Sequence, residues 1–444
     1  MSTETMSRAR YRILATNFAI LMLNYADRAV IGVVAPVMIA EFGFSKATFG
    51  WILAAFAFTY SPFGFIGGWL ADRIGPRKTM AWAIAVWSTF TALTAAGMGF
   101  VSLLLIRLAF GAGEGPQATV TAKLMHNWFP RTERGTALGI ANAATPLGGA
   151  IGTPLVVLFM SIANDNWRVP FIVLGVLGVF ALIGWLAVVR DVPQEHPAAN
   201  AAEVSYITGV DPNAQQTSEG AGHNRPAPVP FREWGPYLKR PAVWSTALAY
   251  FGYAWILWTF LSWFPTYLVE ERGVDLTALA IGGAIPWVGG CIGLAAGGIL
   301  TDWLVRRSGN PVAPRRNLVI VCLTMTALLF AAIGLVRTEW TAVLLMTAVV
   351  FFLYLTGAQY WLIVGEAVPA NSYGAVSGAV QAFATLASII APVLTGYLVD
   401  SSLGWTGVFA LAGAIAIVGV LALAIFGRVG RETPASPAPA QTAS

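Results

Sequence analysis

Residues 13–38 read ILATNFAILMLNYADRAVIGVVAPVM, and this stretch determines how the rest of the chain is interpreted. It is apolar over a length that exceeds the roughly 20 residues of a membrane-spanning helix, yet it carries Asp27 and Arg28 near its centre. A charge at mid-membrane costs roughly 2.5–3.5 kcal/mol even on the most lenient insertion scale, so such residues persist mainly where they pair or line a cavity. A second apolar segment holds Arg107 and Glu114. Two arginines and two carboxyls inside an apolar shell predict an anion site coupled to protonation.

The composition indicates a polytopic membrane protein. Of the 444 residues, 57% are hydrophobic and only 11% are charged, with a mean hydropathy of +0.68, whereas soluble domains carry about 25% charged residues. The pI near 9.3 does not indicate nucleic-acid binding, because the basic residues are scattered between apolar segments. We therefore expect the protein to lie in a lipid bilayer and not to bind nucleic acid. We also expect it to be a monomer.

Motifs of soluble enzymes are missing from the sequence. The two cysteines lie in apolar segments, and the three histidines, in loops or at helix ends, are expected to be solvated. There is no Gly-x4-Gly-Lys-Ser/Thr loop for ATP and no HExxH or CxxC spacing for a metal. We expect neither a metal site nor a cofactor, and no enzymatic activity.

The chain contains twelve apolar segments of membrane-spanning length. Basic residues precede the first segment, as in a signal peptide, but its apolar run is longer than that of a cleaved signal peptide, so we expect it to be retained as a helix. A polar stretch divides the twelve segments into two sets of six, which predicts an N-terminal half over residues 1–190, a cytoplasmic linker loop over 191–241, a C-terminal half over 242–430 and a disordered tail over 431–444. The segments centre on residues 14–38, 48–71, 79–99, 101–124, 135–161, 168–189, 243–268, 278–304, 317–336, 341–365, 372–399 and 405–427.

Positive charge predicts the orientation of these segments. With both termini inside, the inner loops and tails hold 20 of the 26 Lys and Arg residues and the outer loops hold four. Cytoplasmic loops of membrane proteins carry such an excess of Lys and Arg. Both termini are therefore expected to be cytoplasmic.

The two halves resemble each other in sequence. GWLADRIGPR at 68–77 recurs weakly as GILTDWLVRR at 298–307, and the Pro and Gly spacing at 130–139 recurs at 369–378. Repeated halves are typical of transporters in which the binding site lies between two pseudo-symmetric bundles.

Residues 68–78, GWLADRIGPRK, resemble the signature loop of the major facilitator superfamily. Within it, the chain is similar to the anion:cation symporter group, which includes bacterial galactonate, glucarate and hexuronate carriers. The motifs that carry this resemblance are NYADR at 24–28, RLAFGAGEG at 107–115, WFPRTER at 128–134 and WRVPF at 167–171. The resemblance implies a multi-pass protein of the bacterial inner membrane with twelve helices in two six-helix halves.

The resemblance also implies roles for the buried charges. Asp27 and Glu114 match the protonation sites of galactonate carriers, while Arg28 and Arg107 serve anion binding or coupling. Tyr25 lies three residues before Arg28, on the same helix face, so both are expected to contact a substrate carboxylate, which a guanidinium binds bidentately. Arg107 is either a second anion ligand or the partner of one of the two carboxyls. A static ion-pair network that only orients helices is the structural alternative.

Further cavity residues follow from the same resemblance: Tyr60, Trp361 and Gln381 match positions that contact substrate. Gln381 replaces an expected asparagine, and Thr145 stands where a glutamine is expected, with Asn142 one turn earlier. Packing is an equally good explanation for each of these residues. The aromatic residues of segment 243–268 are expected to face lipid, as membrane helices routinely carry them, although Tyr250, Tyr253 and Trp258 could reach the cavity.

The signature loop is expected to act in gating. Asp72 can pair with arginines on the inner face, with Arg77 and Arg134 as candidates, and Asp302 is its counterpart in the second half. The resulting prediction is a proton-coupled importer of an organic monoanion, with a sugar acid (a hexonate, hexarate or hexuronate) as the expected substrate. Two alternatives are a carrier of aromatic or short hydroxy carboxylates and a non-transporting receptor on the same fold.

Overall fold

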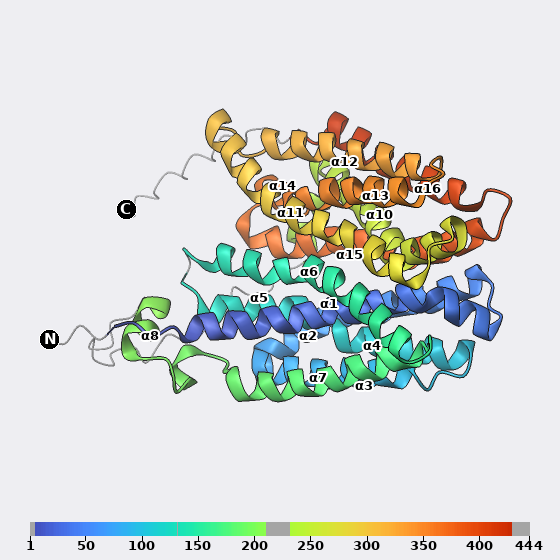
Figure 1. The fold of residues 1–444 in the computed structure, drawn as a ribbon. Coiled ribbons are helices and arrows are strands. Elements are labelled where there is room, and N and C mark those ends of the chain that lie inside the picture. Colours follow the sequence, from blue (N-terminus) through green and yellow to red (C-terminus); the bar gives the residue numbers. More distant parts are fainter. Residues whose placement is uncertain (1–4, 131, 210–230, 429–444) are drawn as a thin grey trace, which may run out of the picture.

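The computed structural model describes residues 5–130, 132–209 and 231–428, which are helical with short connections. Short helices η1 (Pro193–Glu195), α8 (Ala201–Thr208) and α9 (Phe231–Leu238) lie between the two sets of long ones. The other helices are α1 (Ala9–Phe42), α2 (Lys46–Ile74), α3 (Pro76–Thr94), α4 (Phe100–Glu114), α5 (Gln117–Trp128), α6 (Arg134–Ile162), α7 (Arg168–Val188), α10 (Pro241–Arg272), α11 (Leu276–Ser308), α12 (Ala313–Ile333), α13 (Glu339–Leu355), α14 (Gln359–Ala367), α15 (Ala370–Val399) and α16 (Gly404–Phe426) (Figure 1).

Each apolar segment predicted from the sequence coincides with one helix or with two consecutive shorter helices. Within the described residues, ten helical segments are long and apolar enough to cross a membrane, with α13 and α14 counted together. The chain is therefore a multi-pass, all-helical membrane protein. That α3 and the α4–α5 pair also cross, which would complete twelve spans, remains a prediction.

Polar side chains define where several of these helices begin. The Ser45 hydroxyl accepts a hydrogen bond from the Thr48 amide at the start of α2, and the Asp275 carboxylate accepts one from the Ala278 amide at the start of α11. Such caps satisfy backbone amides that lack a partner in the first helical turn.

The fourth segment of each half is interrupted. α4 ends at Glu114 and α5 begins at Gln117, because Pro116 has no amide hydrogen and its ring disfavours a continuous helix. In the second half, α13 ends at Leu355 and α14 begins at Gln359. The equivalent position of the two breaks agrees with the internal repeat found in the sequence.

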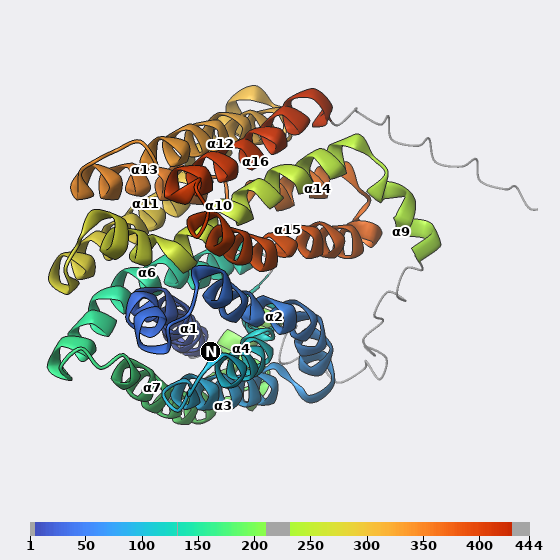
Figure 2. The same cartoon turned by 90° about the vertical axis from the view of Figure 1, so that its right-hand side faces the viewer.

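The helices form two bundles, α1–α7 and α10–α16, which lie one above the other in Figures 1 and 2. Between the bundles, α6 packs on α11, α2 packs on α15 and α1 packs on α10. With each interrupted pair counted once, the second helix of either bundle therefore meets the fifth helix of the other. The residue limits predicted for the two halves remain a prediction.

The described part of the loop between the bundles is docked on the first bundle. The buried Glu203 carboxylate of α8 accepts hydrogen bonds from the Ala9 amide at 2.9 Å and the Arg10 amide at 3.1 Å, at the start of α1. His196 is only 8% exposed and packs edge-on against Trp128, so its expected solvation was wrong. His223 and the tail over 431–444 lie outside the described residues.

The two ends of the molecule differ. α1 begins and α16 ends toward the same end, on the left in Figure 1, which we call the terminal end; the opposite end is the remote end. At the remote end Lys46 pairs with Glu270 at 3.1 Å, and the Ala47 amide donates to Asp400 at 2.9 Å. Both contacts join the first bundle to the second.

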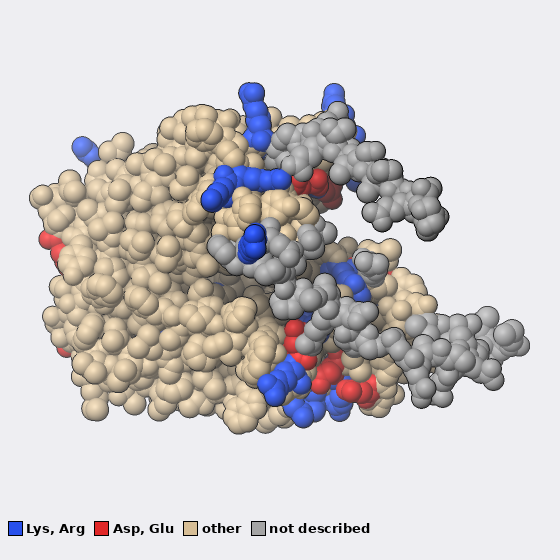
Figure 3. Space-filling model, turned by 180° about the vertical axis from the view of Figure 1, so that it is seen from behind, with Lys and Arg blue, Asp and Glu red and all other residues tan. Residues whose placement is uncertain are grey.

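At the terminal end the bundles are separated. A Cβ added at Gly139 of α6 or at Gly378 of α15 would meet no atom of another described element within 4 Å. Figure 3 shows a notch between the bundles at this end, where most of the visible charged side chains gather. The space between the bundles is therefore open toward the terminal end.

Candidate functional site

A buried ion pair lies at the centre of the first bundle. The Arg28 Nε of α1 donates to the Glu114 Oε2 of α4 at 2.5 Å, and the two side chains are 6% and 0% exposed. The backbone just after Glu114 packs closely on α2, because a Cβ at Gly115 would lie 2.6 Å from the Tyr60 carbonyl. The break after Glu114 ends α4 at the depth of Arg28.

Aromatic rings surround the Arg28 guanidinium. Its Cζ lies 4.9 Å from the Tyr25 ring centroid, 5.3 Å from that of Phe56 and 4.6 Å from that of Tyr60. The prediction that Tyr25 and Arg28 point together agrees with this geometry. Within the described residues Arg28 Nη2 has no hydrogen-bond partner, so the guanidinium keeps a donor with which to bind an anion.

Arg107 is held differently from Arg28. Its Cζ lies 4.7 Å from the Phe110 ring and 5.3 Å from the Phe56 ring, so the Phe56 ring contacts both arginines. Among the described side chains, no carboxylate lies within 4.0 Å of Arg107 as an ion-pair partner. Neither of the pairings that the sequence left open, with Asp27 or with Glu114, is formed in this structure.

Asp27 is the second buried carboxyl of the site. It is 1% exposed, and neither of its oxygens has a hydrogen-bond partner among the described residues. It is close enough to Glu114 and Arg28 to interact with both electrostatically. The four charged side chains singled out in the sequence therefore belong to one cluster.

An aromatic wall formed by the second bundle stands opposite. The Tyr250 ring lies 4.8 Å from that of Tyr360 and 5.1 Å from that of Trp361, and its hydroxyl donates to Gln381 Oε1 at 3.2 Å. Tyr253 stacks on Tyr250 at 5.6 Å. We call these four aromatic residues together with Tyr354 the aromatic wall.

The prediction that the aromatic residues of the seventh segment face lipid was wrong. Tyr253 is 7% exposed, and Trp263 and Tyr267 are fully buried. The reason is the position of α10, which packs against α1, α15 and α16 and therefore buries most of its circumference.

The two bundles meet at aromatic contacts beside the arginines. The Tyr25 ring meets Trp287 edge-on at 6.5 Å, and the Phe56 ring lies 5.8 Å from Trp258. Tyr354 is close enough to Tyr25 and Arg28 to interact with them electrostatically. The aromatic wall therefore faces the charged cluster across the bundle interface.

Sequence reasoning missed Phe56, Tyr354, Tyr360 and Trp287. One signal was available for Phe56, which lies four residues before Tyr60 and therefore shares its helix face; the two rings stack at 5.0 Å. Tyr354 and Tyr360 flank the interruption between α13 and α14, which the sequence did not predict.

The other predicted cavity residues line the terminal side of the interface. Thr145 is half-buried and donates to the backbone carbonyl of Asn142 in its own helix, and Asn142 is exposed. Gln381 is exposed as well, and Trp361 is half-buried. Thr145 is close enough to Tyr25 and Tyr354 to interact with both, and Trp361 and Gln381 contact Tyr250, so these three residues border the aromatic wall.

The predicted gating residues lie at the terminal end. Asp72 pairs with Lys123 at 3.0 Å, while the Arg77 guanidinium donates to the Leu186 carbonyl. Arg134 donates to the Phe129 carbonyl, and Asp302 of α11 is exposed. In this structure the contacts of Asp72, Arg77 and Arg134 described above lie within the first bundle.

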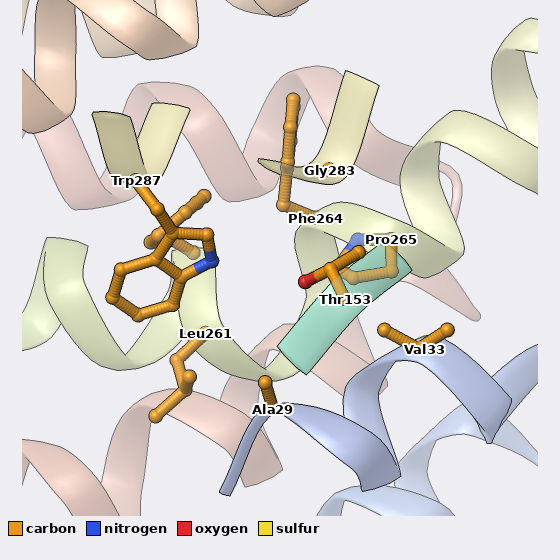
Figure 4. Close-up of a pocket in the computed structure, with 9 residues that line it drawn as sticks. Ala29, Val33, Thr153, Leu261, Phe264, Pro265, Gly283 and Trp287 are labelled. Carbon is orange, nitrogen blue, oxygen red and sulfur yellow. The ribbon is translucent and has the colours of Figure 1, made fainter. Parts of the chain in front are cut away.

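An apolar pocket closes the site toward the remote end. It is lined by Ala29 and Val33 of α1, Thr153 of α6, Phe264 of α10 and Trp287 of α11 (Figure 4). Its free space is about 10 Å³, which is enough for one water molecule. Among the described residues, this pocket leaves too little free space for an organic solute to pass from Arg28 toward the remote end.

Comparison with known proteins gives consistent results. The family model of the Major Facilitator Superfamily matches residues 18–388 and again 315–444. The hexuronate transporter of Bacillus subtilis (strain 168) is 37% identical over 424 residues, which cover 95% of this chain and 96% of that protein. A probable sulfoacetate transporter of Cupriavidus necator is 31% identical, covering 94% of this chain and 93% of its own.

A solved structure has the same fold. A bacterial homologue of the human lysosomal transporter Spinster, in an inward-facing and occupied conformation, aligns with a TM-score of 0.73 at 19% identity, covering 96% of this chain and 99% of that one. The paired bundles, the buried charged cluster and the family match agree. The chain therefore belongs to the major facilitator superfamily, in the family that includes bacterial sugar-acid transporters.

Proposed function

We propose that this protein is a secondary transporter that imports an organic monoanion, a sugar acid, together with protons across the bacterial inner membrane. The observation that carries the proposal is the buried pairing of Arg28 with Glu114 beside the carboxyl of Asp27, which has no hydrogen-bond partner among the described residues. These groups lie inside the first bundle, beside the aromatic contacts through which it meets the second bundle.

Charge balance provides the coupling. With both carboxyls ionised, the cluster of Asp27, Arg28, Arg107 and Glu114 is neutral, and Glu114 occupies one donor of Arg28. Protonation of Glu114 and Asp27 leaves a net positive cluster and releases Arg28 to bind a carboxylate bidentately. Loss of the protons restores the internal pair and expels the anion.

The aromatic wall supports a sugar acid as substrate. Arg28, with Tyr25 and Tyr60 beside it, would hold the carboxylate, and Arg107 would supply a second positive charge. The rings of Tyr250 and Trp361 would stack against the apolar face of a sugar ring, since ligand sites combine apolar surface with a few polar groups. Gln381, Thr145 and Asn142 would contact hydroxyl groups. The 37% identity to a hexuronate transporter supports this substrate class.

Alternating access would expose this site to each side of the membrane in turn. The excess of Lys and Arg in the loops of the terminal end supports a cytoplasmic position for both termini, so the structure corresponds to an inward-facing state. In the opposite state the terminal end would close, and Asp72, Arg77, Arg134 and Asp302 would form contacts between the bundles.

A second candidate is a carrier of short organic anions. The 31% identity to a probable sulfoacetate transporter favours it, and a sulfonate, like a carboxylate, suits a pair of guanidinium groups. The remaining alternative is a receptor that binds the anion without transporting it. Any measured flux of an acid across the membrane would exclude this alternative.

Uptake into proteoliposomes with an imposed proton gradient tests the proposal. The panel comprises hexuronates, hexonates, hexarates, sulfoacetate and aromatic acids, for the wild type and Asp27→Asn. We expect gradient-driven accumulation of one acid, and we expect Asp27→Asn to keep exchange but lose accumulation.

The control is Asp165→Asn, an exposed carboxyl in the α6–α7 connection at the remote end, where asparagine tolerates the left-handed backbone. It should behave as the wild type. If none of the acids moves under any gradient, the transporter proposal is wrong.

A further inference from the structure

Helix α1 carries a row of polar side chains that the anion site does not use. Arg10, Asn17 and Asn24 follow one another at intervals of seven residues, and they are 3%, 0% and 0% exposed. Seven residues are about two helical turns, so the three side chains share one face. That face points into the first bundle.

Helix α5 supplies polar groups to the same region. α1 packs on α5, and Gln117 and Thr121, one turn apart, are both buried. The Thr121 hydroxyl donates to Asn17 Oδ1 at 3.1 Å. We call Asn24, Gln117, Thr121 and Asn17 the polar seam.

The polar seam begins at the Glu114 carboxyl. Glu114 Oε2 accepts the hydrogen bond from Arg28, on the side of the anion site, whereas Oε1 has no partner among the described residues. The Asn24 side chain is close enough to this carboxyl to interact with it, although the geometry falls short of a well-formed hydrogen bond. The other charged groups that face Glu114 are Asp27 on α1 and Arg107 on α4.

The polar seam contains more hydrogen-bonding capacity than its side chains use on one another. Asn24 Nδ2, Asn24 Oδ1 and Asn17 Nδ2 lack a partner in the described part of the chain. An unsatisfied buried polar group costs about 1–3 kcal/mol, and internal water with two to four polar neighbours removes that cost. Asn24 and Asn17 are about 10 Å apart along the helix axis, so a continuous path between them requires a short row of water molecules.

We propose that the polar seam is a hydrated proton path that connects Glu114 to the terminal end and is separate from the substrate cavity. A proton leaves Glu114 Oε1 for a water molecule held by Asn24. Each member of the hydrogen-bonded row accepts a proton on one side and passes one on, so that for every proton that leaves Glu114 one proton is released to bulk water at the other end. The cluster of Arg10, Glu133 and Glu203 lies there, with Arg10 Nε 3.5 Å from the partly exposed Glu133.

A separate path solves a problem of the proposed transport cycle, on which this inference rests. Arg28 must hold the substrate carboxylate while Glu114 is protonated, so the substrate blocks the cavity side of Glu114. Because Arg28 engages Oε2 and Asn24 interacts with the same carboxyl, a proton on Oε1 can leave toward the polar seam while the anion still occupies the cavity.

The test removes polarity from the seam but keeps the branched four-atom skeleton of the side chain, in Asn24→Leu and Asn17→Leu. Asn24→Ser restores a group that can hold water. The control is Asn317→Leu, at an exposed position of α12. A pH-sensitive dye trapped in proteoliposomes reports proton flux during uptake, and counterflow reports movement of the anion alone.

We expect counterflow within about twofold of the wild type for all variants, and proton flux at least tenfold slower in Asn24→Leu and Asn17→Leu, a change equivalent to roughly 1.4 kcal/mol or more in barrier. Asn24→Ser should recover most of the rate. Unchanged proton flux in both leucine variants would overturn the proposal.

A second measurement needs no substrate. Infrared spectroscopy after a pH jump follows the carboxyl band of Glu114, identified by its loss in Glu114→Gln. Slower protonation in Asn24→Leu than in the wild type supports the polar seam as a proton path, whether or not any acid is transported. A failure to transport any acid would refute the proposed function but not the proton path. Equal rates refute the polar seam even if transport is proton-coupled.

Discussion

Phe56 contacts both guanidinium groups of the site, 5.3 Å from the Cζ of Arg28 and 5.3 Å from that of Arg107. A cation over an aromatic face gains about 0.5–2 kcal/mol, depending on how far it is desolvated. Two buried positive charges would otherwise face each other across apolar surface. The ring therefore holds the arginines apart and gives each an attractive surface.

We expect Phe56→Leu to weaken substrate binding and Phe56→Tyr to preserve it. Loss of one or two cation–π contacts should raise the KM for uptake by roughly 3- to 30-fold, since 1.4 kcal/mol corresponds to a factor of ten. Uptake kinetics in proteoliposomes measure this. The control is Phe65→Leu, at a position of α2 that is 81% exposed. A KM for Phe56→Leu equal to that of the wild type would assign the ring to packing alone.

At the scale of helices, the sequence predicted the members of the charged cluster but not their pairing. Asp27, Arg28, Arg107 and Glu114 stand out because charge is rare inside apolar segments. The pairing of each carboxyl with an arginine depends on the depth and rotation of its helix. For Glu114, the break at Pro116 and the close approach of α4 to α2 determine the depth and the rotation of α4.

The environment of α10 was not predictable for a related reason. A helix that is apolar all round has no polar face to indicate which side meets the solvent, and lipid and protein neighbours select for the same residues. Burial of Trp263 and Tyr267 follows only from the neighbours of α10 in the assembled bundle.

Closure of the remote end depends on the contact between α6 and α11. The Trp287 ring lies against Gly149 where a Cβ would be, so Gly149→Val should separate the two helices. Overpacking of this kind costs typically 1–3 kcal/mol, and here the cost falls only on the closed remote end. We expect the population to shift toward a state that is open at that end.

Labelling of a cysteine at Val33, in the apolar pocket, by a membrane-impermeant maleimide measures this opening. The background carries Cys291→Ser and Cys322→Ala. Gly149→Val should increase labelling from the outside about tenfold, given a shift of roughly 1.4 kcal/mol. Gly139→Val, whose added side chain meets no atom within 4 Å, should not. Equal labelling in both variants would contradict this role of the contact.

At the scale of the whole molecule, the two bundles are latched at the remote end by few polar contacts. Lys46 pairs with Glu270, and the Ala47 amide donates to Asp400. A surface hollow of about 410 Å³ adjoins Lys46 and Glu270, so water screens the pair. Exposed ion pairs contribute only about 0–1 kcal/mol, which suits contacts that must break in every transport cycle.

We expect the double variant Glu270→Gln/Asp400→Asn to favour opening of the remote end without unfolding either bundle, because it removes contacts between the bundles only. Spin labels at Ser161 of α6 and Thr338 before α13, both exposed, report the distance across that end by double electron–electron resonance. A loss of about 1–2 kcal/mol should raise the ratio of open to closed molecules roughly 5- to 30-fold.

Glu271→Gln is the matched control, since Glu271 pairs with Arg272 of its own helix. A distance distribution identical to that of the wild type would show that apolar packing alone, chiefly at Trp287, holds the remote end closed.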